Sequence, residues 1–144
     1  HIHAVFAVRN RECLIKKEWK VELYKYMTAI IQNNNHKVLV INGVEDHVHI
    51  LFGMRPTQAL SELMQMIKGD SSKWINQNKL TTFKFSWQEG FGAFSYSKSH
   101  VGNVVNYINN QEQHHKKKSF HEEYMEMLKK YEVDFDPNYI FKPI

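Results

Sequence analysis

The chain has 144 residues and a mass of 17.2 kDa, which fits one domain and leaves little room for two. Apolar residues make up 42% and charged residues 24% of the sequence, so the composition excludes disordered and fibrous proteins. Basic residues exceed acidic ones by 19 to 15, and the net charge of +4 with a pI near 9.1 weakly favours a polyanionic partner.

Two features of the sequence bear on the compartment. No apolar run reaches the length of a membrane span, and no signal-peptide pattern opens the chain. Cys13 is the single cysteine, so it has no partner for an internal disulfide, which is usual in a reducing compartment. We therefore expect a cytoplasmic protein with no membrane partner.

The first half of the chain predicts three strands and a helix. Alternation predicts a strand over residues 2–9, and apolar residues at three- and four-residue spacing predict a helix from 15 to 30. Two further strands are expected over residues 36–44 and 46–52. The dipeptide Asn42-Gly43 near the end of the first of these favours a tight hairpin turn.

The second half predicts a helix, a strand and two more helices. Apolar spacing indicates a helix over residues 60–75, and the aromatic, glycine-punctuated stretch 83–95 contains the fourth strand. A third helix, capped by Ser97 or Ser99, carries an apolar side made of Val101, Val104, Val105 and Ile108.

A capping box opens the last predicted helix. Ser119 followed by Glu122 is that pattern, and the helix is expected to bury Phe120, Tyr124, Leu128 and Tyr131. The proline-containing tail 134–144 predicts an extended arm, which leaves residues 1–133 as a single domain.

The order β-α-β-β-α-β-α-α predicts an α+β fold of the ferredoxin-like or RRM-like split β-α-β type. Such a fold has a four-stranded antiparallel sheet with helices on one face, and here a C-terminal tyrosine-bearing helix is added. The second face of the sheet is expected to be open and to need a cover or a ligand.

His47-Val48-His49 is the sharpest local signal. Side chains alternate along a strand, so the two imidazoles share one face, roughly 6–7 Å apart, while Val48 packs under the helices. The histidines are then placed to hold a divalent ion, with Asp46 as a partner behind them. Taken alone, His-x-His is a weak motif, and two strand histidines without a function are the more common explanation.

A polar stripe on the third helix is the second signal. His100, Asn103, Tyr107, Gln111 and His114 follow at three- and four-residue spacing and share one helical face. A tyrosine phenolate can attack phosphorus when a metal polarises the phosphate, and a glutamine oxygen can complete a hard-metal shell begun by two histidines. An exposed face on which Tyr107 only covers apolar surface is the competing interpretation.

Basic residues give the third signal, a candidate contact for a phosphate backbone. The lysine run 116–118 has an alternative explanation as a solvated turn. His114, His115 and His121 suggest a separate metal cluster, and the alternative is that they are surface histidines. Aromatic residues 83–94 either stack single-stranded bases or belong to the core. The candidate DNA-binding residues are Arg9, Arg11, Lys68, Lys73, Lys116, Lys117 and Lys118.

Together these motifs resemble a known family. Asp46-His47-Val48-His49-Ile50-Leu51 resembles the histidine-hydrophobic-histidine (HUH) strand of single-strand-specific nucleases. The stretches Trp87–Ser95 and Tyr107–Gln111, followed by His114-His115, are similar to the single-tyrosine HUH transposases. These are the IS200-like transposases, including relatives associated with repetitive extragenic palindromes, and the likeness covers nearly the whole chain.

The resemblance implies a transposase that cleaves and rejoins single-stranded DNA at hairpin-flanked ends. Tyr107 would be the nucleophile and form a 5′-phosphotyrosine, while His47, His49 and Gln111 would hold Mg²⁺ or Mn²⁺ on the scissile phosphate. It further implies a bacterial cytoplasmic homodimer, in which the tyrosine helix of one subunit often completes the site of the other. One tyrosine per subunit agrees with a dimer, because concerted cutting of two ends needs two nucleophiles.

Two other functions compete with this one. An HUH replication initiator or relaxase shares the histidine strand, but the short chain and the lack of a helicase or second-tyrosine motif disfavour it. A non-catalytic RRM-like module would bind nucleic acid through aromatic residues on the open sheet face. The third strand offers His47, His49 and Leu51 on that face instead, which argues against such a module.

Overall fold

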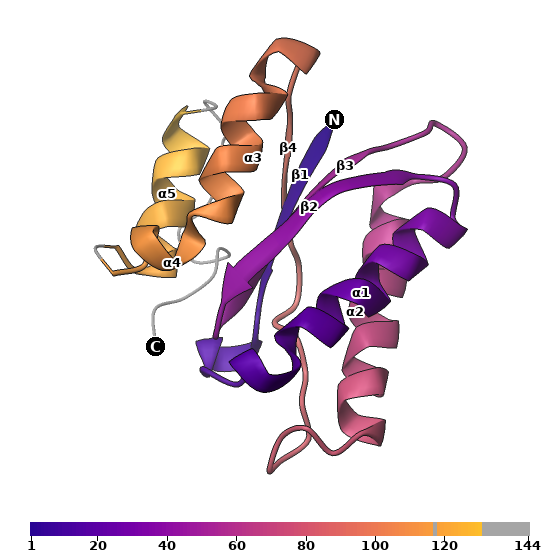
Figure 1. The fold of residues 1–144 in the computed structure, drawn as a ribbon, viewed down its shortest axis with the longest axis vertical. Helices are drawn as coiled ribbons and strands as arrows, with labels where there is room; N and C mark the ends of the chain where they lie inside the picture. Colours follow the sequence, from indigo (N-terminus) through magenta and orange to yellow (C-terminus); the bar gives the residue numbers. More distant parts are fainter. Residues whose placement is uncertain (117, 131–144) are drawn as a thin grey trace.

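A computed structural model describes residues 1–116 and 118–130 of the chain (Figure 1). The strands are β1 (Ile2–Ala7), β2 (Lys37–Val44), β3 (His47–Gly53) and β4 (Gly92–Ser95). The helices are α1 (Lys17–Asn33), α2 (Leu60–Gln77), α3 (Val101–Asn109), α4 (Gln111–His114) and α5 (Phe120–Lys130), with short 3-10 turns η1 (Arg9–Arg11) and η2 (Lys98–His100).

The four strands form one sheet in the order β2-β3-β1-β4, with every neighbouring pair antiparallel. The predicted α+β fold, a split β-α-β arrangement around a four-stranded antiparallel sheet, is confirmed. β3 lies inside the sheet, with β1 on one side and β2 on the other, so its backbone is hydrogen-bonded along both edges. The strand that carries the two histidines is therefore held more rigidly than an edge strand.

One face of the sheet packs against α1 and α2 and forms the main hydrophobic core (Figure 1). Val48, Ile50 and Phe52 on β3 point into it and are fully buried, as the strand alternation predicts. Leu23 and Met27 of α1 and Leu63 and Ile67 of α2 cover them, one helical turn apart in each helix.

The opposite face carries α3, α4 and α5 instead of being open (Figure 1). Val104 and Ile108 of α3 pack on Leu51 of β3. Phe120 and Leu128 of α5 belong to a second cluster with Val5 and Ala7 of β1 and with Phe94 of β4. The chain thus covers both faces of its own sheet, and the histidine side of β3 lies beneath helices.

The hairpin between β2 and β3 turns later than the sequence predicts. β2 continues through Asn42-Gly43 to Val44, and Glu45-Asp46 form the turn, so the expected turn at Asn42-Gly43 is wrong. Gly43 meets a different need, because a Cβ at this position would lie 2.2 Å from the backbone oxygen of His47. Close approach of the two strands requires the glycine.

The third predicted helix is also interrupted. α3 ends at Asn109, and α4 begins at Gln111, so the continuous stripe from His100 to His114 is split by Asn110. The side-chain amide of Asn42 donates to the carbonyl oxygens of Ile108 (2.9 Å) and Asn109 (3.3 Å), which satisfies the end of α3. α4 can then turn Gln111 inward, towards the sheet.

Three sequence predictions fall outside the described residues: the arm 134–144, the burial of Tyr131 and the position of Lys117. The division into a domain 1–133 and an arm stays a prediction for the same reason. Within the described ranges, no helix is long and apolar enough to cross a membrane.

Candidate active site

The site is built on β3, whose alternation separates its two kinds of side chain. His47 and His49 point to the face opposite Val48 and Ile50, beneath α3, α4 and α5. Both imidazoles are 0% exposed. Polar groups buried so completely need hydrogen-bond partners, and the structure supplies one for each ring nitrogen.

The Nδ1 atoms of His47 and His49 have different hydrogen-bond partners. His47 Nδ1 donates to Asp46 Oδ1 over 2.6 Å, as the proposed partnership of Asp46 requires. His49 Nδ1 lies 2.7 Å from Nε2 of His3, a buried histidine of β1 whose ring stacks on that of His49. Each contact fixes the ring orientation and leaves Nε2 aimed into the site.

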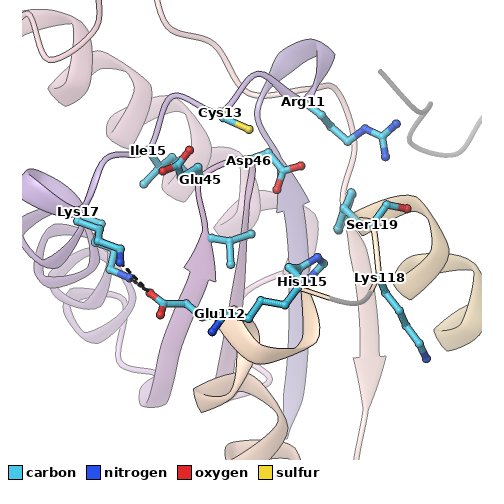
Figure 2. A pocket seen from close by; sticks show the side chains of 14 residues that line it. Arg11, Cys13, Ile15, Lys17, Glu45, Asp46, Glu112, His115, Lys118 and Ser119 are labelled. Carbon is cyan, nitrogen blue, oxygen red and sulfur yellow. Dashed lines mark hydrogen bonds and ion pairs between the residues drawn. The ribbon is translucent and has the colours of Figure 1, made fainter.

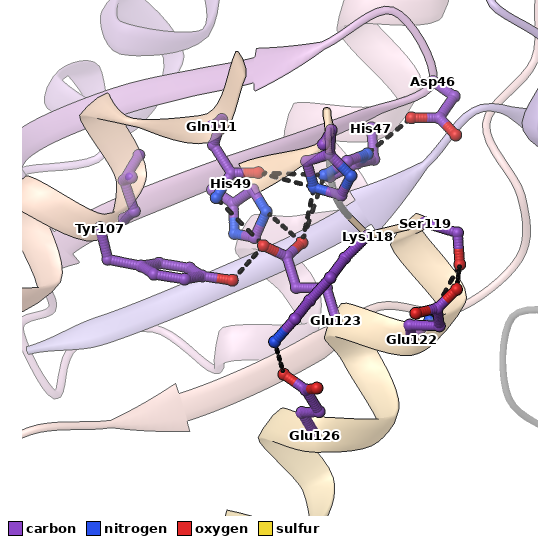
Figure 3. Close-up of polar contacts among 12 residues, drawn as sticks. Asp46, His47, His49, Tyr107, Gln111, Lys118, Ser119, Glu122, Glu123 and Glu126 are labelled. Carbon is purple, nitrogen blue, oxygen red and sulfur yellow. Dashed lines mark hydrogen bonds and ion pairs between the residues drawn. The ribbon is translucent and has the colours of Figure 1, made fainter. Parts of the chain in front are cut away.

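Glu123 of α5 lies at the point where these Nε2 atoms converge (Figure 3). Its Oε1 atom is 3.2 Å from His49 Nε2, 3.4 Å from His47 Nε2 and 3.1 Å from His115 Nε2. One ligand atom from each of these four residues lies within 4.8 Å of the others, and the group is almost wholly buried. His47, His49, His115 and Glu123 are called the histidine–glutamate cluster below.

Gln111 completes the surroundings of the cluster. Its Oε1 atom is 3.2 Å from His47 Nε2 and 3.1 Å from His115 Nε2, and its amide nitrogen donates to Glu123 Oε2 over 3.2 Å. The side-chain oxygen therefore faces the same small space as the imidazole nitrogens. The sequence-predicted set of His47, His49 and Gln111 comes together in one place.

Tyr107 of α3 also reaches the cluster. Its hydroxyl donates a short hydrogen bond to Glu123 Oε2, and its ring lies edge-on to His49 with centroids 6.0 Å apart. The ring of His114 packs on the other side, 4.6 Å away. The candidate nucleophile and the candidate metal ligands thus occupy one site within a single chain (Figure 3).

The charges in the site are strongly coupled. Burial acts to raise the pKa of Glu123, but hydrogen bonds from His115, His47 and His49 outweigh it and hold that pKa far below the usual range. Burial acts to lower the pKa of His47, and hydrogen bonds and charges from Asp46 and Glu123 raise it overall. The metal-free site therefore contains a carboxylate that imidazole N–H groups stabilise.

Burial shifts the pKa values of three further groups of the site. Burial lowers the pKa of His49, and it does the same to His3, which sits next to His49. Burial and the Glu123 carboxylate raise the pKa of the Tyr107 phenol, so the tyrosine is held in its protonated form.

The donor set fits a divalent cation. Imidazole nitrogens with a carboxylate and an amide oxygen suit Mn²⁺ and related ions, whereas Mg²⁺ relies on the oxygen donors. An ion would replace the protons that hold the Nε2 atoms around Glu123, and Asp46 and His3 already supply the outer contacts typical of metal-ligating histidines. The residues present thus match the chemistry of such a centre.

The predicted basic residues are spread over the molecule. Arg9, Lys73 and Lys116 are exposed, and Lys118 pairs with Glu126 over 2.6 Å. Lys68 donates to the carbonyl oxygens of Gln88 and Gly90 on the α2 side of the sheet, away from the cluster. Arg11 is buried close to the site, and its ring contact is with Phe120.

Sequence reasoning missed Glu123 and considered His115 either a surface histidine or part of a separate metal cluster, not a neighbour of His47 and His49. Glu123 lies three residues after Phe120 and four before Met127, so it is a carboxylate within the apolar face of α5. That position was a usable signal, because an unpaired charge on a buried face is costly. His115 follows Gln111 by one helical turn, but the expected unbroken helix pointed to His114 instead.

Comparisons with known proteins identify a matching family and two similar structures. A family model described as "Transposase IS200 like" matches residues 1–111. A candidate transposase from Deinococcus radiodurans has a TM-score of 0.62 at 19% identity, with 76% of this chain and 88% of that one covered. A REP-associated tyrosine transposase bound to a REP hairpin has a TM-score of 0.62 at 14% identity, with 79% and 67% covered. No curated protein matches.

Fold and family match together define a transposase, that is, a DNA-cleaving enzyme. The chain belongs to the IS200-like transposase family, because the match spans well over half of its length. The resemblance drawn from the HUH strand and the tyrosine helix is confirmed, and the family match favours a transposase over the replication initiator and the RRM-like module. Enzymes of this family use a divalent metal, for which the histidine–glutamate cluster is a possible site.

Proposed function

We propose that this protein cleaves and rejoins single-stranded DNA through a 5′-phosphotyrosine formed at Tyr107. The observation that carries the proposal is the hydrogen bond from the Tyr107 hydroxyl to Glu123, which also contacts His47 and His49. A nucleophile and a divalent-metal ligand set seldom meet in a buried site by chance.

His47, His49 and Gln111 would hold Mg²⁺ or Mn²⁺, and His115 and Glu123 would add ligands from the other side of the space. The ion, when bound, would polarise the scissile phosphate and offset the negative charge that develops on it. Asp46 and His3 keep the two β3 imidazoles in the orientation that ligation requires.

Tyr107 performs the substitution at phosphorus. Its phenolic oxygen forms the new P–O bond, and the bond from phosphorus to the 3′ oxygen breaks, so a free 3′ hydroxyl leaves after taking up a proton. Glu123 Oε2 accepts the phenolic hydrogen bond and is therefore the acceptor for the phenolic proton. Because the phosphotyrosine conserves the energy of the broken ester, attack by a 3′ hydroxyl reverses the step without ATP.

The substrate we propose is a strand with a hairpin next to the cleavage site. Support comes from the family and from the similar structure of a tyrosine transposase bound to a REP hairpin. Tyr107 reaches the histidines of its own chain, which favours attack in cis over the exchange of tyrosine helices between the subunits of the expected homodimer.

A covalent-adduct assay tests the proposal. End-labelled strands with hairpins from DNA flanking the gene are incubated with protein and Mn²⁺ or Mg²⁺, and a denaturing gel shows whether label migrates with protein. We expect an adduct that disappears with Tyr107→Phe and with chelator, whereas Tyr26→Phe, a change on α1, leaves it intact. Cleavage by the Tyr107→Phe variant would show that another group is the nucleophile.

A mixing experiment tests attack in cis. Tyr107→Phe retains the ligands, and the double variant His47→Ala with His49→Ala retains the tyrosine, so only exchange of helices between subunits can restore a complete site. We expect no adduct from the mixture, and recovered adduct would establish attack in trans.

A further inference from the structure

A cavity adjoins the histidine–glutamate cluster at His115, and Tyr107 is not among the residues that line it (Figure 2). Its volume is about 630 Å³. His115 of the cluster and Asp46, the partner of His47, form part of its wall, so the space begins where the candidate metal centre ends. A strand lying across the centre would therefore continue past this cavity.

Most charged groups lining the cavity are basic. Glu45, Asp46 and Glu112 are the acidic residues, and they are engaged with Lys16, with His47 and with Lys17 and Lys20, respectively. The basic residues of the lining are Arg11, Lys17, Lys20, Lys116 and Lys118. The excess of positive charge favours an anion.

Arg11 differs from these lysines in its burial and in its hydrogen bonding. It is 3% exposed, and its Nε and Nη2 atoms have no hydrogen-bond partner among the described residues. Its guanidinium carbon lies 5.9 Å from the ring centroid of Phe120, which positions the group at the start of α5 without neutralising its charge. Asp46 is near enough to act on it electrostatically but forms no ion pair with it.

The backbone at Arg11 is itself constrained. Asn10 and Arg11 both have positive φ values, 56° and 50°, and the Arg11 amide donates to the Val8 carbonyl over 2.7 Å. Two successive non-glycine residues in the left-handed region are costly, and such strain persists where the surrounding structure enforces it. This turn directs the Arg11 side chain back towards the sheet and α5.

A buried guanidinium without a partner is expensive, and it calls for an anion with paired oxygens. We propose that Arg11 binds a phosphodiester of the single-stranded DNA next to the scissile phosphate, with Lys116 at the rim of the same subsite. This subsite rests on the proposed function for its position relative to the cut. It deepens that function by assigning a specific role to one arginine, where composition alone indicates only diffuse positive charge.

Binding without cleavage gives the first test. Fluorescence anisotropy in EDTA measures the affinity for an oligothymidylate of about twelve nucleotides, a length typical of single-strand sites. We expect Arg11→Met to weaken binding about tenfold. We also expect the slope of log K against log salt to become shallower by about 0.7, the value for one phosphate contact on a single strand.

Two further variants sharpen this measurement. Lys25→Met removes an exposed positive charge on α1 that does not line the cavity, and it should leave both affinity and slope unchanged. Arg11→Lys keeps the charge but loses the planar fork, so its affinity should be intermediate. If Arg11→Met matches the wild type in affinity and slope, the subsite does not exist.

A measurement on the wild-type protein covers the case in which Arg11→Met does not fold. The chain has three arginines, so the Arg11 Nε–H signal can be assigned in a ¹⁵N NMR spectrum with Arg9→Lys and Arg55→Lys. The signal should shift on addition of the oligothymidylate in EDTA. A signal that stays in place while the strand binds would overturn the proposal.

The outcomes separate the two proposals. Absence of a covalent adduct with the wild type counts against the phosphotyrosine mechanism, and both binding measurements proceed without it. If the adduct forms, Arg11→Met should reduce it at limiting strand and recover most of it at saturating strand, because a phosphate contact beside the cut acts on binding. A loss that saturating strand does not reverse would place Arg11 in the chemical step instead.

Discussion

The two faces of β3 carry side chains of opposite polarity. On one face, Val48, Ile50 and Phe52 pack against α1 and α2 in an apolar core. On the other, His47 and His49 are equally buried but meet a carboxylate, an amide and a phenol. Burial of apolar groups stabilises the fold, whereas burial of coupled polar groups contributes little or costs free energy. The difference shows that the second face is organised for chemistry.

The largest expected effect removes the chemistry from the polar face. The double variant His47→Ala with His49→Ala should lose metal-dependent adduct formation down to the background of the gel assay, because both β3 ligands are gone. Chemical denaturation should show a folded protein. Undiminished cleavage would mean that the ligands lie elsewhere.

The matching change on the apolar face should lower the stability of the fold and leave the chemistry intact. Phe52→Ala empties a fully buried position, and we expect a loss of about 3–5 kcal/mol in the free energy of unfolding. Urea denaturation followed by circular dichroism measures it. The fraction that remains folded should still form adduct at the wild-type rate, and a slower rate per folded molecule would show that the two faces are coupled.

Metal binding should stabilise the fold through the polar face alone. Free Mn²⁺ at about 100 times its Kd should add about 2.7 kcal/mol of stability, which raises Tm by roughly 5–11 °C. Differential scanning fluorimetry with and without EDTA measures the shift. The double histidine variant should show none, and an equal shift in that variant would place the bound ion outside the cluster.

The smallest expected effects concern the groups behind the histidines. His3→Gln and Asp46→Asn should each weaken Mn²⁺ binding by about 10–100-fold, because each fixes the orientation of one ligating ring. Isothermal titration calorimetry measures the affinity. Thr28→Ala on α1 is a control that should bind as the wild type does, and unchanged affinity in both test variants would limit His3 and Asp46 to a structural role.

The strand pattern was enough to predict the sheet and the shared face of His47 and His49, because a period of two fixes which side chains lie together. The contact between His3 and His49 depends on the register of β1 against β3, which a single sequence does not reveal. Glu123 belongs to a helix and is 74 residues from His49, about half of the chain. Its role emerges only when α5 docks on the sheet.

The break at Asn110 explains why helical periodicity did not place His115 beside Gln111. A continuous helix places Tyr107, Gln111 and His114 on one face, whereas the restart at Gln111 brings His115 to the site. Asn42, which contacts the end of α3, belongs to β2, so the residues of the third helix alone do not predict where that helix ends. Long-range hydrogen bonds of this kind limit what local spacing can predict.

The alternation along β3 makes the strand sensitive to changes in length. A one-residue insertion or deletion between His47 and Phe52 would exchange the two sides beyond that point, which sends imidazole into the apolar core and aliphatic groups into the histidine–glutamate cluster. A substitution alters one side chain and leaves the alternation of the others in place. We therefore expect natural variants of this strand to differ in residue type but not in residue number.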